Sequence, residues 1–468
     1  LQRALPRVNV RRHPDPLATR SLQWITSVNE LGARLAQELR HRPPLEEDAQ
    51  ADQRALWNGL YEAVTHRTEW RAALKRSLAG LAYENRAQVD PALVQKILPD
   101  PFAASVSRLE RFAACPFAHF SEYTLRLSER LEAGLQDVDL GTVWHAVLES
   151  FMNRLNDGNE RLSDLEDDEI GDRITQIADV TVPKLSDEMM LTQARNAYLI
   201  DRSKGHLSRV TRWQRNAARV GRFRPIAAEF AFGFGDKTAG AITLKTPKGR
   251  TLKLRGFIDR VDVAEIGDTL LGMVIDYKRS VRRTLDLTAV YHGLALQLVG
   301  YLVAMKQRGE SLAGRPIVPV AAFYLPLLEP YKTVSHPDEQ KTVTYQLRGI
   351  ADAEHIEQLD ENVVPGGKSE FMSARLTKEG VPYATSDLAP KGQLSDLMTH
   401  VEQRMVELAD DLLDGNIAVS PYRLLKHMPC SFCPYQSVCR FESHTQPARA
   451  LEAMSRKDVL LRVGEATS

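Results

Sequence analysis

The spacing of hydrophobic positions changes along this chain at about residue 225. Before that point, apolar residues recur every three or four positions, as in Leu31–Leu39 and Trp57–Val64, which predicts helices. After a break at 99–101, Ser105 is placed to cap a helix that carries Glu110. Helical spacing continues to about residue 220, and the acidic stretch at 157–172 is predicted to form a solvated loop and a helix start.

Beyond residue 225 the pattern favours strands, with β-branched and aromatic residues at alternating or continuous apolar positions. The predicted strands are 225–234, 252–263, 269–278 and 318–327. A helix is predicted at about 287–307, a polar loop at 363–390, a long helix at 391–414, and a polar tail after 445. The middle of the chain is therefore predicted to be a mixed α/β core built around a hairpin.

The two strands of that hairpin bring acidic residues and a lysine together. On the first, period two places Asp259 among apolar neighbours, where a carboxylate is costly unless it is paired or binds a cation. The second strand ends with Asp276 and Lys278 on one face and Tyr277 on the other. Two carboxylates and a lysine on one face can hold Mg²⁺ through oxygen ligands. An exposed ion pair at a strand end is the simpler alternative.

Two hairpin registers are open. A loop at Ile266-Gly267 places Asp259 diagonal to Asp276, with backbones roughly 7–8 Å apart. A loop at Gly267-Asp268 places the two carboxylates directly opposite each other. A one-residue slip would send them to opposite faces of the sheet, whereas either of these registers brings them together.

Four cysteines form a second candidate metal site. Three follow the spacing Cys-x2-Cys-x5-Cys, at Cys430, Cys433 and Cys439, and only Cys115 can supply a fourth. Thiolates so spaced converge on a soft metal, and a lone distant cysteine with this triplet favours a cubane iron–sulfur cluster over zinc. Unconnected buried thiols are a further alternative. Disulfides are disfavoured because we expect no export leader in this sequence.

Other polar residues recur at helical spacing. His145 and Glu149 are four residues apart, as are Gln297 and Tyr301, so each pair shares a helix face. A core histidine and an ordinary polar stripe are the simpler interpretations. Residues 202–224 hold eight basic residues and no acidic one. Four of them are predicted to line one side of a helix near Trp213, a face that suits a phosphate backbone: Arg212, Arg215, Arg219 and Arg222. A solvated helix is the alternative.

The composition limits these interpretations. With 468 residues, more than one structural unit is expected. The formal net charge is zero, so a nucleic-acid surface must be a local patch. Apolar runs fall short of the roughly 18–20 residues of a membrane helix, and no Gly-x4-Gly-Lys-[Ser/Thr] motif occurs, so neither a membrane association nor an ATPase is expected.

The order of the motifs resembles a known family. Gly-Thr-x-x-His at 141–145, Gly-Phe-Ile-Asp at 256–259, Ile-Asp-Tyr-Lys at 275–278 and Gln-x-x-x-Tyr at 297–301 resemble the RecB-type branch of the PD-(D/E)xK nucleases. Framed by Cys115 and the cysteine triplet, they resemble the iron–sulfur nucleases of the AddB, Cas4 and Dna2 kind. The segment 105–120 looks most like the AddB family.

The resemblance implies a set of roles. His145, Asp259, Asp276 and the Tyr277 carbonyl would bind Mg²⁺, and Lys278 would be the catalytic lysine. Gln297 and Tyr301 would position the substrate strand. The four cysteines would hold a 4Fe–4S cluster that staples the domain.

The resemblance also implies a biological setting. The chain would hydrolyse one DNA strand, the 5′-ended one, as it is fed from an unwound duplex by an AddA-type helicase–nuclease partner in a heterodimer. This would serve end resection at double-strand breaks for homologous recombination, in the bacterial cytoplasm at the nucleoid. A stand-alone Cas4-like exonuclease and a non-catalytic iron–sulfur DNA-binding or assembly module are the alternatives.

The expected fold is α/β, a restriction-endonuclease-like mixed sheet flanked by helices. We expect a helical region at 1–104 that ends a helicase-like part, a nuclease domain at 105–445, and a tail at 446–468.

Overall fold

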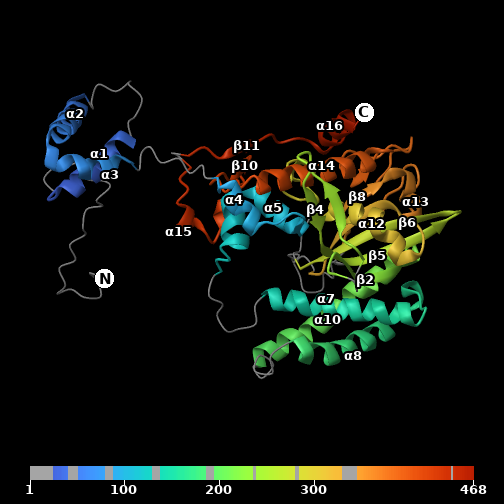
Figure 1. The fold of residues 1–468 in the computed structure, drawn as a ribbon. Coiled ribbons are helices and arrows are strands. Elements are labelled where there is room, and N and C mark those ends of the chain that lie inside the picture. Colours follow the sequence, from blue (N-terminus) through green and yellow to red (C-terminus); the bar gives the residue numbers. More distant parts are fainter. Residues whose placement is uncertain are drawn as a thin grey trace. The chain divides into compact units, whose positions relative to one another are not determined.

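The computed structural model describes residues 25–40, 51–79, 88–128, 137–185, 194–235, 239–279, 284–328, 345–443 and 446–467. It divides into two compact units (Figure 1). The first comprises residues 1–85 with 442–446, and the second comprises residues 86–441 with 447–468. Among the described residues, no helix is both long and apolar enough to cross a membrane.

The first unit is helical, as predicted. Its helices are α1 (Val28–Arg40), α2 (Ala51–His66) and α3 (Thr68–Ala79). A small core of Leu35, Trp57, Val64 and Leu74 holds them together. The parts of the predicted helical region at 1–24, 41–50 and 80–87 lie outside the described residues.

A six-stranded mixed sheet forms the centre of the second unit, which confirms the predicted fold class. Its strand order is β2-β5-β6-β7-β8-β9. Strand β5 is antiparallel to β2 and β6, whereas β6 is parallel to β7. The strands are β2 (Arg224–Phe232), β5 (Gly256–Ile266), β6 (Thr269–Lys278), β7 (Val318–Pro326), β8 (Arg348–Asp352) and β9 (Leu388–Ala389).

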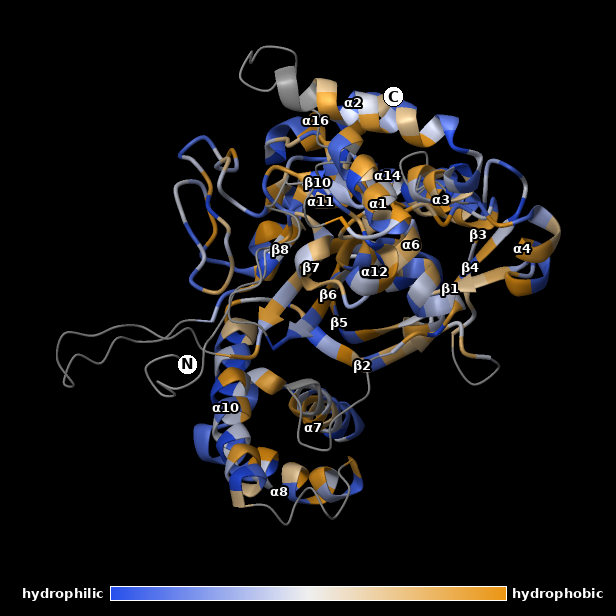
Figure 2. Ribbon diagram, turned by 90° about the vertical axis from the view of Figure 1, so that its left-hand side faces the viewer, coloured by the Kyte–Doolittle hydropathy of each residue, from blue (hydrophilic) through white to orange (hydrophobic). Residues whose placement is uncertain are grey.

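Helices cover both faces of this sheet, and Figure 2 shows hydrophobic residues concentrated between the layers. One core joins the sheet to α5 (Val106–Ala114), α12 (Gln297–Ala313), α14 (Gln393–Leu413) and α16 (Arg456–Thr467). The other joins it to α7 (Asp137–Asp157), α8 (Asp167–Leu185) and α10 (Ala194–Arg219). The sheet is therefore buried on both sides, as the continuous apolar run of β6 requires.

A second, three-stranded sheet was not predicted. It contains β1 (Phe102–Ala104), β4 (Thr251–Leu254) and β3 (Ile242–Lys245), in that order. The single strand expected at 252–263 is divided at Arg255, whose N–H donates to the Ala104 carbonyl at 3.0 Å. The chain leaves one sheet there and enters the other as β5.

The helix expected at 287–307 is also divided. It consists of α11 (Leu287–Tyr291) and α12, with Gly293 between them at φ +82°. That backbone conformation suits glycine and ends the first helix. As a result, α12 begins at Gln297, one of the predicted site residues.

The compact units differ from the expected domain boundaries. Helix α4 (Pro91–Ile97) and β1 belong to the second unit rather than to the helical N-terminal one. The segment expected as a tail, at 446–468, also packs into the second unit from residue 447 on, and Val459 and Val463 of α16 are fully buried. The remaining short elements are α6 (Pro116–His119), η3 (Phe120–Thr124), η4 (Leu162–Asp164), η5 (Ala353–His355), α13 (Ile356–Leu359), β10 (Tyr422–Leu424), η6 (Pro429–Phe432), α15 (Gln436–Cys439) and β11 (Arg449–Leu451).

Candidate active site and cysteine cluster

The β5–β6 hairpin adopts the second of the two registers considered. Ile266 pairs with Thr269 and Arg260 pairs with Ile275, so the loop is Gly267-Asp268. Continued by one residue, this register places Asp259 opposite Asp276. The Tyr277 N–H donates to Asp259 Oδ2 at 2.7 Å, which fixes the first carboxylate against the end of β6.

A chain of contacts leads from Asp276 to α12. Asp276 is buried and forms an ion pair with Lys278, whose Nζ also donates to Gln297 Oε1 at 3.2 Å. Gln297 Nε2 in turn donates to the Tyr301 hydroxyl at 2.8 Å. Burial and the charge of Asp259 raise the pKa of Asp276 to about 6, against the lowering effect of Lys278. The structure thus brings four of the predicted residues into one network.

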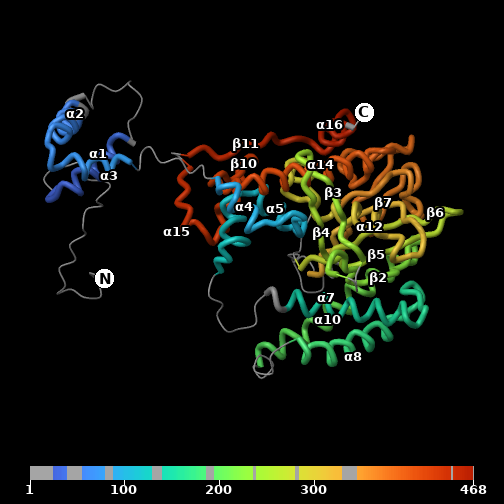
Figure 3. Tube along the Cα trace, in the orientation of Figure 1, coloured from blue at the N-terminus to red at the C-terminus, as the bar shows by residue number. Residues whose placement is uncertain are grey.

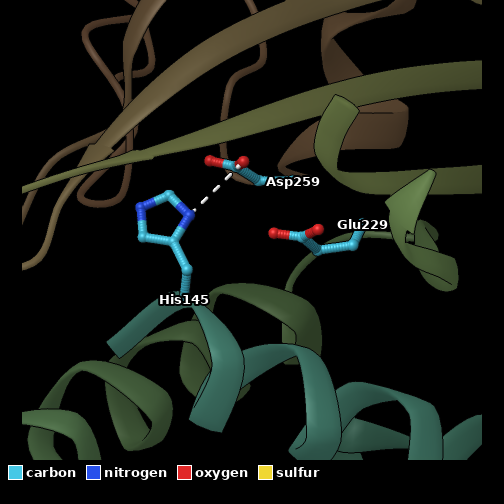
Figure 4. A group of neighbouring side chains, drawn as sticks. All are labelled: His145, Glu229 and Asp259. Carbon is cyan, nitrogen blue, oxygen red and sulfur yellow. Dashed lines mark ion pairs between the residues drawn. The ribbon is translucent and has the colours of Figure 1, made fainter. Parts of the chain in front are cut away.

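A group of three potential ligands lies at Asp259 (Figure 4). His145 of α7, Glu229 of β2 and Asp259 of β5 each offer one ligand atom, and these atoms lie within 4.8 Å of one another. His145 Nδ1 is 3.4 Å from Asp259 Oδ1. The helix and two adjacent strands therefore converge on one point.

Glu229 was missed by the sequence analysis. The pairs Ala228–Arg260 and Phe230–Ile258 bracket it, so β2 places it across from Asp259. Its φ of +52° departs from ordinary strand backbone and marks a local distortion. Its only sequence signal is an acidic residue in a strand, because it belongs to none of the motifs.

The carboxylates at this site are crowded, and burial together with the charge of a neighbouring carboxylate raises the pKa values of Glu229 and Glu149. Burial and the charge of Asp259 raise the pKa of Glu229, and burial and the charge of Glu229 raise the pKa of Glu149. Burial lowers the pKa of His145, but the hydrogen bond and charge of Asp259 outweigh it, and the net shift is upward. A bound cation would stabilise every one of these carboxylates in its ionised form.

The donor set fits a small divalent cation. Magnesium–oxygen bonds of about 2.0–2.1 Å place octahedral ligands roughly 3–4 Å apart, so a group within 4.8 Å needs little contraction to close on the ion. Carboxylate oxygens are its preferred protein ligands. His145, Glu229 and Asp259 therefore suit such a metal, with Asp276 beside them.

Glu110 connects this site to α5. Its Oε1 accepts hydrogen bonds from the backbone N–H groups of Leu296 and Gln297 at 2.6 and 2.8 Å. Leu296, the N-cap residue of α12, makes no side-chain cap of its own. Glu110 therefore caps the helix on which Gln297 and Tyr301 stand.

A buried polar network supports the opposite face of the hairpin. Arg260 forms an ion pair with Asp262 and donates to Gln214 Oε1 at 2.6 Å. The Tyr277 hydroxyl donates to the same oxygen at 3.2 Å. Gln214 thus fixes α10 to the back of both strands. This side of β5 is therefore buried although it carries the charged residues Arg260 and Asp262.

The predicted arginine face is largely occupied by structural contacts. Arg212 and Arg219 donate to the carbonyls of Asp167 and Ser163, at 3.0–3.1 and 2.8 Å. Arg215 is buried, with an ion pair to Asp167. Helix α10 ends at Arg219, so Arg222 lies beyond it rather than on its side. This packing argues against Arg215 as a phosphate contact. Trp213 packs against Tyr345 and Phe371.

The four cysteines come from distant parts of the chain to one place. Figure 3 shows α15, which ends at Cys439, beside the segment that contains α5 and α6. Cys115 and Tyr435 are buried there, with Cys433 packed against them. Burial and the charges of the other three thiols raise the pKa of Cys430 to about 11. Cys430 therefore lies near enough to the other three thiols to feel their charge, whereas the one group of ligand atoms within 4.8 Å of one another among the described residues is that at Asp259.

Known proteins match the chain over this same region. A sequence profile of the PD-(D/E)XK nuclease superfamily matches residues 103–440. The chain belongs to this superfamily. The (D/E)XK half of its name is matched by Asp276-Tyr277-Lys278, whereas Ile258 stands before Asp259 where the name has a proline.

Individual relatives are similar over most of the chain. Each is the B-type subunit of an ATP-dependent helicase/deoxyribonuclease. The protein from Geobacillus thermodenitrificans is 31% identical over 83% of the chain, the one from Symbiobacterium thermophilum 33% over 88%, and the one from Desulforudis audaxviator 33% over 83%. The match covers 34–36% of each relative, so the chain spans about a third of their length. As a PD-(D/E)XK nuclease, it contains a metal-dependent hydrolytic site.

Proposed function

We propose that this chain hydrolyses DNA phosphodiester bonds with Mg²⁺ at the site formed by His145, Glu229, Asp259, Asp276 and Lys278. The observation that carries the proposal is the convergence of His145, Asp259 and the Asp276–Lys278 pair at the end of one hairpin. The superfamily supplies the reaction class, and the name of the relatives supplies DNA as the substrate.

Each residue has a part in this mechanism. Bound Mg²⁺ would polarise the scissile phosphate and lower the pKa of the attacking water. Asp276 and Gln297 hold the Lys278 ammonium at the edge of the site, where it can orient that water or offset charge in the transition state. Tyr301 fixes Gln297 in turn. The Tyr277 carbonyl stays a predicted additional ligand.

Single substitutions test the assignment. Lys278→Ala should remove Mg²⁺-dependent cleavage of labelled single-stranded DNA while leaving the circular dichroism spectrum and the unfolding midpoint near those of the wild type. Lys306→Ala is the matched control, because Lys306 is exposed on α12 and its variant should cleave like the wild type. Full cleavage by Lys278→Ala would remove the assignment.

The biological setting is proposed on the same relatives. Since they are B-type subunits of a helicase/deoxyribonuclease, we infer a heterodimer with an AddA-type helicase–nuclease subunit and a role in end resection for homologous recombination, in the bacterial cytoplasm at the nucleoid. From the AddB resemblance we propose that the 5′-ended strand is cut. Duplexes labelled at the 5′ or 3′ end, assayed with and without the partner, test both points. Equal cutting without a partner would favour a stand-alone Cas4-like exonuclease instead.

We also propose that Cys115, Cys430, Cys433 and Cys439 hold a 4Fe–4S cluster. Their convergence from both ends of the nuclease region supports a structural staple. Protein purified without oxygen should be brown, contain about four iron atoms per chain, and lose its visible absorption in Cys433→Ala. Zinc instead of iron on metal analysis would overturn this part of the proposal and leave the nuclease assignment intact.

A further inference from the structure

Two phenylalanines form an exposed aromatic surface where β2 ends and β5 begins. Phe234 and Phe257 are each 44% exposed, although such side chains are ordinarily buried. Their rings stack with centroids 4.5 Å apart and an interplanar angle of 28°. The Arg255 guanidinium carbon lies 5.7 Å from the Phe234 ring centroid. The surface is therefore aromatic with a cation at its edge.

The backbone is shaped to produce this pair. Gly233 has φ +81°, and a Cβ on it would lie 2.8 Å from Arg255 Cβ and 2.9 Å from the Leu254 carbonyl oxygen. Only glycine fits this close turn, which carries Phe234 from the end of β2 back to β5. The pairing of Ala231 with Phe257 places the second ring beside it. The stack thus depends on a specific turn.

Phe257 lies on β5 and Phe234 on the turn that follows β2, and these are the two strands that carry Asp259 and Glu229. Phe257 is two residues before Asp259 on β5, about 7 Å along the strand. Phe234 follows Glu229 on the same stretch of β2 and its turn. A nucleotide whose phosphate is at Asp259 has its neighbouring base within reach of this surface.

We propose that Phe234 and Phe257 form a stacking platform for an unpaired base of the substrate DNA strand, next to the bond that is cut. An exposed aromatic face is complementary to the face of a base, and stacking of this kind is tolerant of sequence. Bases in a duplex are already stacked on both faces, so the platform selects single-stranded DNA. Arg255 supplies a positive charge beside it for the backbone. The inference rests on the proposed function.

Binding without cleavage tests the platform. The 468-residue chain carrying Lys278→Ala is titrated with single-stranded oligonucleotides in which 2-aminopurine replaces one base at each position in turn. The fluorescence should change strongly at one position. Adding Phe257→Leu or Phe234→Leu should remove that change and weaken binding about 5- to 150-fold, the range for loss of one stacked base. Phe257→Tyr should retain both the fluorescence change and the binding affinity.

The controls separate this inference from the nuclease assignment. Tyr383→Leu removes another exposed aromatic residue, away from these strands, and should bind like the parent. Unchanged fluorescence and affinity in both leucine variants would refute the platform. Equal weakening for duplex and single strand would refute it too, because the surface would then not select an unpaired base. If the wild type binds with the expected signal but cleaves no DNA, the proposed function fails while the platform stands.

Discussion

Glu110 offers a stringent test of how the site is positioned, because it touches backbone rather than substrate. Its carboxylate accepts from the N–H groups of Leu296 and Gln297, the N-cap residue and the first residue of α12, and the Gln297 side chain holds Lys278. Glu110→Ala leaves these N–H groups without that acceptor. The first turn of α12 is then expected to loosen, and Gln297 with it.

The size of the effect follows from the contacts. Replacing a side chain that caps a helix N-terminus by alanine costs about 0.5–2 kcal/mol, and a charged acceptor lies at the upper end of that range. If this change in positioning removes about 2 kcal/mol of transition-state stabilisation, kcat falls roughly 30-fold. Glu110→Gln keeps an acceptor oxygen but not the charge, so its kcat should lie between those of the wild type and Glu110→Ala.

Steady-state cleavage of single-stranded DNA separates positioning from binding. We expect kcat to fall in the order wild type, Glu110→Gln, Glu110→Ala, with little change in KM. Glu122→Ala, which removes a half-exposed ion pair with Arg111 in the same part of the fold, should change kcat less than about twofold. If Glu110→Ala lowers the free energy of unfolding but leaves kcat unchanged, Glu110 stabilises the fold only and the reasoning is wrong.

Three further predictions follow from the contacts described. Glu229→Gln should raise the Mg²⁺ concentration for half-maximal cleavage about tenfold or more. Glu149→Gln should raise it less, since of these two residues only Glu229 belongs to the ligand group. The reverse order would exclude Glu229 as a ligand. Burial and the charge of Arg108 lower the pKa of His119 to about 3. In the unfolded chain a histidine has a pKa of about 6.5, so on acidification the unfolded chain binds the proton before the folded protein does. The free energy of unfolding that is present above about pH 6.5 is therefore lost as the pH falls toward 3. The loss is up to about 1.4 kcal/mol per pH unit. Urea unfolding at several pH values should show this slope, reduced in His119→Gln. Arg215→Ala should lower the free energy of unfolding by about 1–3 kcal/mol because it takes a donor from the carbonyl of the buried Leu165. The salt dependence of DNA binding should not change; a change in that dependence would restore Arg215 as a phosphate contact.

The β5–β6 hairpin of the candidate site could be predicted closely from sequence. Alternation along the two strands placed Asp259, Asp276 and Lys278 on one face, and the glycine limited the loop to two positions. Gly267 adopts φ +57° and Asp268 completes the turn, which selects the direct pairing. The Ser105 cap was also predicted correctly, since its hydroxyl accepts from the Arg108 N–H at 3.2 Å.

Other features depend on contacts that no local pattern encodes. Glu229 becomes a potential ligand only because β2 pairs with β5 and bends at that residue. Glu110 reaches α12 across 186 positions of sequence. The arginines of α10 appeared free because their acceptors are main-chain carbonyls at 163–167, which sequence composition does not display.

Under the proposed function, the two-residue turn of the β5–β6 hairpin makes DNA cleavage sensitive to insertions and deletions far from the proposed metal ligands. The turn is about 20–25 Å from Asp259 along the strand, yet it sets which residue of β6 faces that carboxylate. One extra residue in the turn would displace Asp276 and Lys278 to the wrong side of the sheet unless a bulge absorbed it. Two extra residues would lengthen the loop and leave the pairing unchanged. Among homologues, length variation at this turn should therefore occur in even steps, and an odd step should be accompanied by a compensating bulge or by loss of activity.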